Sequence, residues 1–191
     1  MPNLIGVRRQ RSSRRARVIL LAPLAALLVS AQTTPKDVPP KELRGRVQAS
    51  CRNPEPGPAF RLIVRGLKDR KGQLQLELYP ADDKDFLAPD KELIAAGKPF
   101  KRVNRPIPAS GDPVICVRAP GPGRFALAVL HDRDRNGKFG VMGDGVGFPG
   151  DPKLSRSKPS AAAASLRAQQ GVTETEVTLQ YRRGLTFRPL S

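Results

Sequence analysis

Apolar and polar side chains alternate along much of the chain between residues 60 and 181, and this period of two is what most constrains the fold. In residues 73–79, QLQLELY, three leucines alternate with polar side chains, and residues 60–65, FRLIVR, show a similar pattern. Successive side chains of a β-strand point to opposite faces of its sheet, so each run can bury one face and leave the other in water. The pattern predicts a protein built from β-strands.

The two clearest runs, residues 60–65 and 73–79, are joined by a short charged turn and are expected to pair as a β-hairpin. The run at 125–131 is apolar on both faces, which predicts a central strand covered on both sides. Between Pro80 and Gly97 the alternation stops, and Pro89 with a closing Gly97 indicates one or two helical turns. A further clear strand is predicted at residues 176–181, further strand signals lie at 100–107 and 113–118, and a weak one lies at 43–49.

Proline and glycine support the same fold class. The 191 residues include 20 prolines and 17 glycines, a share that is too high for a helix bundle and suits short strands joined by many turns. With about seven or eight strands, we expect an all-β domain. Its architecture would be an antiparallel two-sheet β-sandwich of the immunoglobulin-like or prealbumin-like kind.

The first 31 residues have the three-part pattern of a secretory signal peptide. Six arginines and no acidic residue fall within the first 17 positions, and residues 18–31, VILLAPLAALLVSA, carry no charge. This run is shorter than the roughly 20 residues of a transmembrane helix and is interrupted by Pro23. We predict cleavage near Ala31, no transmembrane anchor after processing, and a periplasmic or secreted protein. The residues leave open whether export follows the general or the twin-arginine route.

The formal net charge of +17 falls to +11 once the six arginines of the predicted signal peptide are removed, because 28 basic residues then face 17 acidic ones. These charges are spread along the chain, without long basic blocks or interleaved aromatic residues. This distribution argues against nucleic-acid binding. It leaves two interpretations, an ordinary solvated surface or one that attracts an anionic component of the cell envelope, such as lipopolysaccharide or an acidic glycan.

Cys51 and Cys116 are the only cysteines, and both follow the predicted signal peptide. Two thiols in an oxidising compartment most simply form one disulfide. The sequence has neither the C-x-x-C spacing of a redox site nor the ligand number of a structural zinc site. The pair is therefore predicted to form a structural disulfide.

Residues 131–140, HDRDRNGKFG, carry the most recognisable chemistry in the chain. Oxygen-bearing side chains occupy alternate positions before a glycine, as in the first half of a calcium loop of the D-x-D-x-N-G type. The acid at the twelfth position is missing, and an aspartate follows one residue later. Two interpretations stay open, a site for Ca²⁺ or another divalent cation, or a tight turn whose Asp and Asn side chains bond their own backbone. The candidate ligands are four side chains and one backbone carbonyl, from Asp132, Asp134, Asn136, Asp144 and Lys138.

His131 is the only histidine and the one weak candidate for a catalytic side chain. A hydrolase would use it with Asp132 or Asp134 and would need a concave pocket beside it with a second convergent group. The sequence has no nucleophile-elbow, zinc-protease or phosphate-binding motif. The alternative is a hydrogen-bonded structural histidine at the end of a strand, and no catalytic residue is predicted.

These segments resemble the bacterial DUF2141 family, exported proteins of unknown function. The family hallmarks are a strand ending in A-V-x-x-H-D, an N-x-N-G-x-x-D turn and a G-x-G-F segment. The resemblance covers roughly residues 59–182, although Gly140 stands where the family usually has an aspartate. It implies a small β-sandwich outside the inner membrane and supplies no activity. The matching motif residues are His131, Asp132, Asn136, Gly137, Gly147 and Phe148.

The chain is thus predicted to comprise a signal peptide at 1–31, a proline-rich lead-in at 32–58, a β-sandwich domain at 59–182 and a C-terminal tail at 183–191. The favoured function is an exported, non-catalytic module that binds a partner or an envelope component, with a divalent-cation loop at 132–144. Two alternatives stay open, a periplasmic hydrolase and a protein that binds anionic glycan or lipopolysaccharide.

Overall fold

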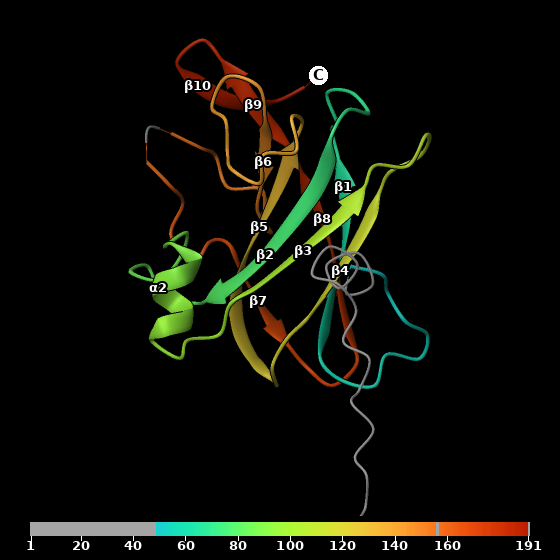
Figure 1. Cartoon of the computed structure of the whole chain (residues 1–191), viewed down its shortest axis with the longest axis vertical. Coiled ribbons are helices and arrows are strands. Elements are labelled where there is room, and N and C mark those ends of the chain that lie inside the picture. The colour runs from blue at the N-terminus through green and yellow to red at the C-terminus, as the bar shows by residue number, and fades with distance from the viewer. Residues whose placement is uncertain (1–48, 156, 191) are drawn as a thin grey trace, which may run out of the picture. The chain divides into compact units, whose positions relative to one another are not determined.

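The computed structural model describes residues 49–155 and 157–190, so the predicted signal peptide and nearly all of the weak strand at 43–49 lie outside the described residues. The described chain is mostly β, with two sheets and one short helix (Figure 1). No helix in this part of the chain has the length and apolar character that crossing a bilayer requires. In chain order the elements are β1 (Ala59–Arg65), β2 (Gln73–Pro80), α2 (Asp90–Ala95), β3 (Lys101–Pro106), β4 (Val114–Arg118), β5 (Gly123–Asp132), β6 (Gly145–Gly147), β7 (Ser165–Ala168), β8 (Val172–Thr178), β9 (Gln180–Arg183) and β10 (Thr186–Pro189).

The smaller sheet has the strand order β4-β1-β8, and its two pairings run in opposite senses. β1 is antiparallel to β4, with Phe60 opposite Val117, and parallel to β8, with Leu62 opposite Thr175. The prediction of a wholly antiparallel sandwich was wrong for the second pair. Parallel neighbours need a long crossover connection, and the chain from β2 to β7 provides it.

The larger sheet has seven strands in the order β10-β9-β6-β5-β2-β3, with β7 paired to β5, and all its pairings are antiparallel. The described residues therefore hold ten strands rather than the predicted seven or eight. β6, β7 and β10 are three or four residues long. Runs this short contain too few alternations to be recognised from the sequence.

β1 and β2 do not form the predicted hairpin, because they belong to different sheets. Their apolar faces, which include Phe60 and Leu62 on β1 and Leu74 and Leu76 on β2, are buried in one shared core. Alternation specifies which side chains are buried, and it does not distinguish strands that pair edge to edge from strands that stack face to face. The run at 176–181 is divided for the same reason, since β8 ends in the smaller sheet and β9 begins in the larger one on either side of buried Leu179.

β5 is buried on both faces, as predicted, and this confirms its central position. Leu127 and Val129 point into the core between the sheets, whereas Ala126 and Ala128 face a second apolar cluster that includes Phe148. Each large apolar side chain buried in this way stabilises the fold by about 1.5–3 kcal/mol. The second cluster forms the base of a pocket on the outer face of the larger sheet.

The helical turns and the disulfide predicted from the sequence are both confirmed. α2 buries Leu93 against the second cluster and is followed by Gly97 in a left-handed conformation (φ 67°). Cys51 and Cys116 form a disulfide that ties the lead-in to β4, with their Cα atoms 5.3 Å apart.

Candidate functional site

An acidic turn, residues 132–144, connects β5 with β6, and its first carboxylate is fully buried. Asp132 has an exposed fraction of 0%. Its Oδ2 accepts hydrogen bonds from Gln73 Nε2 (2.9 Å) and the Gly137 N–H (3.0 Å), and its Oδ1 accepts one from the Asn136 N–H (3.1 Å). A buried carboxylate needs hydrogen-bond donors or a cation around it. The hydrogen bonds to Asp132 therefore hold the turn against the end of β5.

Asp144 closes the turn from its other end. This residue is buried, and its two carboxylate oxygens accept hydrogen bonds from the N–H groups of Arg133 (3.0 Å) and Gly140 (2.8 Å). One carboxylate oxygen from each of Asp132, Asp134 and Asp144 lies within 4.8 Å of the other two. A cation with metal–oxygen distances of about 2.4 Å can bridge oxygens this far apart. The structure therefore brings three of the five predicted ligands together.

The other two predicted ligands, Asn136 and Lys138, take part in local turns. The Asn136 N–H donates to Asp134 Oδ1 (3.1 Å), and the Lys138 N–H donates to Asn136 Oδ1 (2.7 Å). These are the Asx-type turns of the second interpretation of the sequence. The acidic turn is thus ordered by its own hydrogen bonds. From the described residues, each oxygen of Asp134 and of Asp144 accepts one hydrogen bond, which leaves lone pairs that a hard cation can use.

His131 is buried beside the acidic turn, with an exposed fraction of 0%. Its Nε2 lies 2.8 Å from the Lys71 carbonyl oxygen, and its Nδ1 lies 2.6 Å from the Tyr181 hydroxyl. Because a carbonyl oxygen only accepts, Nε2 carries the proton and Nδ1 accepts from Tyr181. Burial lowers the pKa of His131, although the Lys71 carbonyl and Asp69 oppose this effect. Both ring nitrogens are bonded to protein atoms, so this arrangement offers none to a substrate.

Arg133 anchors the acidic turn to the loop between β1 and β2. Its guanidinium makes an ion pair with Asp69, and its Nη1 donates to the Gly143 carbonyl oxygen (3.0 Å). The hydrogen bonds from Arg133 lower the pKa of Asp69 to about 2, although burial opposes them. The Asp69 carboxyl is therefore ionised in the folded state at every pH where the protein is expected to function.

Asp69→Asn is expected to reduce the free energy of unfolding at neutral pH by about 1–2 kcal/mol. The pKa of Asp69 is lower in the folded chain than its ordinary 3.8, so its contribution is complete above about pH 4 and is lost as the pH falls through about 2. Urea unfolding at neutral pH and near pH 2 tests this, with Asp112→Asn, which removes an exposed ion pair to Arg65, as the matched control. An Asp69→Asn deficit that persists unchanged near pH 2 would contradict the assignment.

The G-x-G-F segment lets β6 lie close to its neighbours. A Cβ atom on Gly145 would stand 2.4 Å from a ring carbon of Tyr181, and one on Gly147 would stand 2.6 Å from Val177 Cγ1. Phe148 follows directly and packs edge-on against the Phe86 ring, with centroids 5.8 Å apart. The motif residues therefore place β6 between β5 and β9 and put an aromatic side chain on the outer face of the larger sheet.

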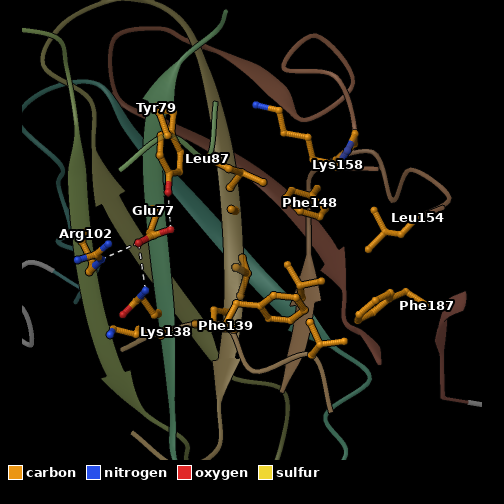
Figure 2. Close-up of a pocket in the computed structure, with 18 of the residues that line it drawn as sticks. Glu77, Tyr79, Leu87, Arg102, Lys138, Phe139, Phe148, Leu154, Lys158 and Phe187 are labelled. Atoms are coloured by element: carbon orange, nitrogen blue, oxygen red, sulfur yellow. Dashed lines mark hydrogen bonds and ion pairs between the residues drawn. The ribbon is translucent and has the colours of Figure 1, made fainter. Parts of the chain in front are cut away.

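A pocket of about 740 Å³ opens on that outer face (Figure 2). Its floor comes from β2, β5 and β6, and the acidic turn supplies part of its wall through residues 137–139 and Val141. Residues 87–90, 154–155 and 157–159 contribute further walls. Most of the side chains that line it are apolar, among them Leu87, Ala128, Leu130, Phe139, Val146, Phe148, Leu154 and Phe187.

Polar side chains of β2 and β3 line one side of the pocket and bond mainly to one another. Glu77 accepts hydrogen bonds from Arg102 Nε (2.6 Å), Gln75 Nε2 (3.1 Å) and the Tyr79 hydroxyl (2.6 Å). Arg102 also donates to Asp90 Oδ2 (2.8 Å). Burial, together with the charge of Glu77, raises the pKa of Tyr79 far above its ordinary value, so its hydroxyl stays a donor. Because these polar groups form hydrogen bonds with one another, the surface that the pocket offers to a ligand is mainly apolar.

Gln75 is the exception among these polar groups. It is 2% exposed and lines the pocket, and its Nε2 is used by Glu77. No hydrogen bond to its Oε1 occurs among the described residues. Because Gln75 lines the pocket, this oxygen can accept a hydrogen bond from a bound molecule.

The sequence pattern found the acidic turn and did not find the pocket. Gln75, Glu77 and Tyr79 alternate with the leucines of β2, and a surface position in water is the ordinary expectation for such side chains. In the structure they face the second apolar cluster and the pocket. Tyr181, which bonds His131, lies 50 residues further along the chain, and no local pattern connects the two.

Comparison with known proteins identifies the family. Neither the curated proteins nor the solved structures gave a match to this chain. The family model described as "Uncharacterized protein conserved in bacteria (DUF2141)" matches residues 63–176, which is more than half of the chain and includes the acidic turn and the floor of the pocket. The resemblance seen in the sequence is thereby confirmed, and the chain belongs to the DUF2141 family of uncharacterized bacterial proteins.

Proposed function

We propose that this domain is an exported, non-catalytic binding module whose pocket takes a small, mainly apolar molecule. The observation that carries the proposal is the pocket itself. Its volume of about 740 Å³ falls within the range of roughly 300–1,000 Å³ that is usual for small-molecule sites. Its lining is apolar apart from a few fixed polar groups, which is also the usual composition of such sites.

The polar groups of the pocket narrow the class of molecule. Gln75 Oε1 favours a ligand with a hydrogen-bond donor, such as a hydroxyl or an amide N–H. Lys138 and Lys158 also line the pocket, and together they tolerate an anionic substituent. The proposed ligand is therefore amphipathic, with an apolar body and at least one donor.

One observation supports a module that is not catalytic, and another supports a location outside the cytoplasm. His131 is buried, is not among the residues that line the pocket and has both ring nitrogens bonded, so the hydrolase alternative lacks an accessible histidine. The Cys51–Cys116 disulfide suits an oxidising compartment. Export through the predicted signal peptide fits that compartment.

The pocket is tested by titrating the protein with 1-anilinonaphthalene-8-sulfonate, a fluorescent anion with an apolar ring system. Phe139→Ser is expected to weaken binding of this probe roughly fivefold, because a partly exposed aromatic wall is lost. Ala128→Leu, which adds volume to the floor, is expected to weaken it further. Ile94→Ser removes a more exposed apolar side chain outside the pocket and serves as the control. Equal affinity in all four proteins would refute the pocket as a binding site.

We further propose that the acidic turn holds a divalent cation, with Ca²⁺ the best match. The three converging carboxylates support this, because hard oxygen ligands from a turn followed by glycine are the donors that Ca²⁺ prefers. Asp132 and Asp144 would hold the ion from the two ends of the turn, and Asp134 would cover it from solvent. A bound cation would neutralise repulsion among the carboxylates and stabilise the wall of the pocket.

Thermal unfolding with Ca²⁺, with Mg²⁺ and with a chelator tests this second proposal. A ligand that binds only the folded state adds about 2.7 kcal/mol at 100 times its dissociation constant, so Ca²⁺ should raise the Tm by several degrees. Asp134→Asn should abolish that increase while changing the Tm in chelator little, since Asp134 is exposed. Glu92→Gln, which removes an exposed carboxylate on α2, is the matched control. Identical melting of the unmodified protein in all three solutions would remove the cation site.

A further inference from the structure

Exposed apolar side chains gather at one end of the domain. Of the seven large hydrophobic residues that are exposed in the described chain, four lie on the acidic turn and the adjacent β9–β10 hairpin. Met142 is 80% exposed on the turn, and Leu185 is 76% exposed at the tip of the hairpin. Phe139 and Val141 are the other two, at 44% and 42%. Figure 1 shows the hairpin and the connection from β5 to β6 at the same end of the larger sheet.

The turn and the hairpin form one continuous surface rather than two separate projections. The rings of Phe139 and Phe187 are in contact, with centroids 5.8 Å apart. Arg182 Nη1 lies 3.5 Å from the sulfur of Met142, which places a cation directly beside the most exposed apolar side chain. We call this surface, made of the acidic turn and residues 180–189, the distal surface.

The distal surface also carries cations that have no acidic partner. Each of three arginines donates from its Nε to an uncharged oxygen, Arg135 to Gly72, Arg182 to Gly184 and Arg188 to Thr186. Two further basic side chains, Arg183 and Lys138, are exposed. None of these five is in an ion pair with another described residue, and the one ion pair of the described chain that involves this surface is that of Arg133 with Asp69.

We propose that the distal surface docks the domain on an anionic lipid bilayer. Exposed apolar tips can enter the boundary between headgroups and acyl chains, while arginines behind them stay at the level of the lipid phosphates. Met142 and Leu185 are the tips, and Arg182 and Arg183 are the adjacent cations. An acidic glycan would satisfy the arginines and would give no apolar environment to the two tips, so the combination favours a lipid surface.

This inference goes beyond ligand binding in the pocket, because it concerns where the domain is held. The charge on the distal surface does not depend on Gln75 or on the floor of the pocket. The exposed Asp134 belongs to the acidic turn and already accepts two hydrogen bonds from Asn136. Loss of probe binding and loss of lipid binding are therefore expected in different variants.

Co-sedimentation with vesicles tests the proposal in the processed protein. Vesicles that contain phosphatidylglycerol should bind the protein, and pure phosphatidylcholine vesicles should not. Each basic residue near an anionic surface accounts for roughly a fivefold change in affinity, so Arg182→Gln with Arg183→Gln should weaken binding by more than tenfold. Lys91→Gln with Arg124→Gln changes the net charge equally at positions outside the distal surface and should leave most of the binding intact.

The apolar tips provide the second arm of the experiment. Met142→Ser with Leu185→Ser should weaken vesicle binding and leave probe binding in the pocket unchanged. Equal losses in the two charge-matched double variants would show general attraction by net charge and would overturn the proposal. Binding to alginate, a soluble acidic glycan, that equals vesicle binding and is insensitive to the serine variants would also overturn it.

Discussion

Gly72→Ala is expected to destabilise the domain by about 3 kcal/mol or more, the sum of a left-handed backbone conformation and a backbone clash. Gly72 has φ +76°, and a Cβ atom there would stand 2.0 Å from the Asp132 carbonyl oxygen and 2.5 Å from Arg133 Cα. Neither obstacle is a flexible side chain, so the loop before β2 would have to move away from the acidic turn. The variant should therefore disturb the acidic turn as well as the stability.

Gly97→Ala is the matched control for this prediction. Gly97 also has a positive φ, +67°, but no atom lies within 4 Å of the position its Cβ would occupy. Its substitution should cost about 1–2 kcal/mol from the backbone conformation alone. Urea unfolding of both variants measures the difference, and equal losses would show that the approach of Gly72 to Asp132 is not a tight contact in solution.

Removal of the Cys51–Cys116 disulfide is expected to lower the free energy of unfolding by about 4 kcal/mol. The bridge joins residues that are 65 positions apart, and its loss lets the unfolded chain expand. Other contacts of the lead-in with β4 would remain, among them the ion pair of Glu55 with Arg118 and the hydrogen bond from the Cys116 N–H to the Ala49 carbonyl oxygen. A chain with Ala at both positions should unfold at markedly lower urea concentration than the oxidised protein.

A reducing agent distinguishes the disulfide from the side chains themselves. It should lower the stability of the unmodified protein to about that of the double alanine variant and leave the variant unchanged. A difference of less than about 1 kcal/mol between oxidised and reduced protein would contradict the prediction.

The sequence predicted which residues are buried more successfully than how strands pair. β5 was recognised because its side chains are apolar at every position from Phe125 to Leu130, and such a run is typical of a central strand covered on both faces. The hairpin of β1 and β2 was predicted wrongly, because the same alternation serves two strands that meet face to face across a core. Which strands become neighbours depends on contacts between distant segments, such as β1 with β8, and no local pattern records them.

Of the candidate site, too, only one part could be predicted from the sequence. The acidic turn could be predicted because its residues are consecutive and their spacing follows from the chemistry of a hard cation. The pocket could not, because its lining comes from strands in both halves of the domain and from the acidic turn, together with residues 87–90, 154–155 and 157–159. Gln75 and Glu77 look like ordinary surface residues of a strand until the chain that covers them is in place.

The central claim is that the acidic turn and the pocket form one binding unit, since Phe139 and Val141 belong to both. Linkage requires that a cation which stabilises the wall also strengthens binding to it. The most direct measurement is the affinity for 1-anilinonaphthalene-8-sulfonate with Ca²⁺ and with chelator, in the unmodified protein and in Asp134→Asn. We expect tighter binding with Ca²⁺ in the unmodified protein and no difference in the variant. An affinity that does not change when Ca²⁺ demonstrably raises the Tm would contradict the claim.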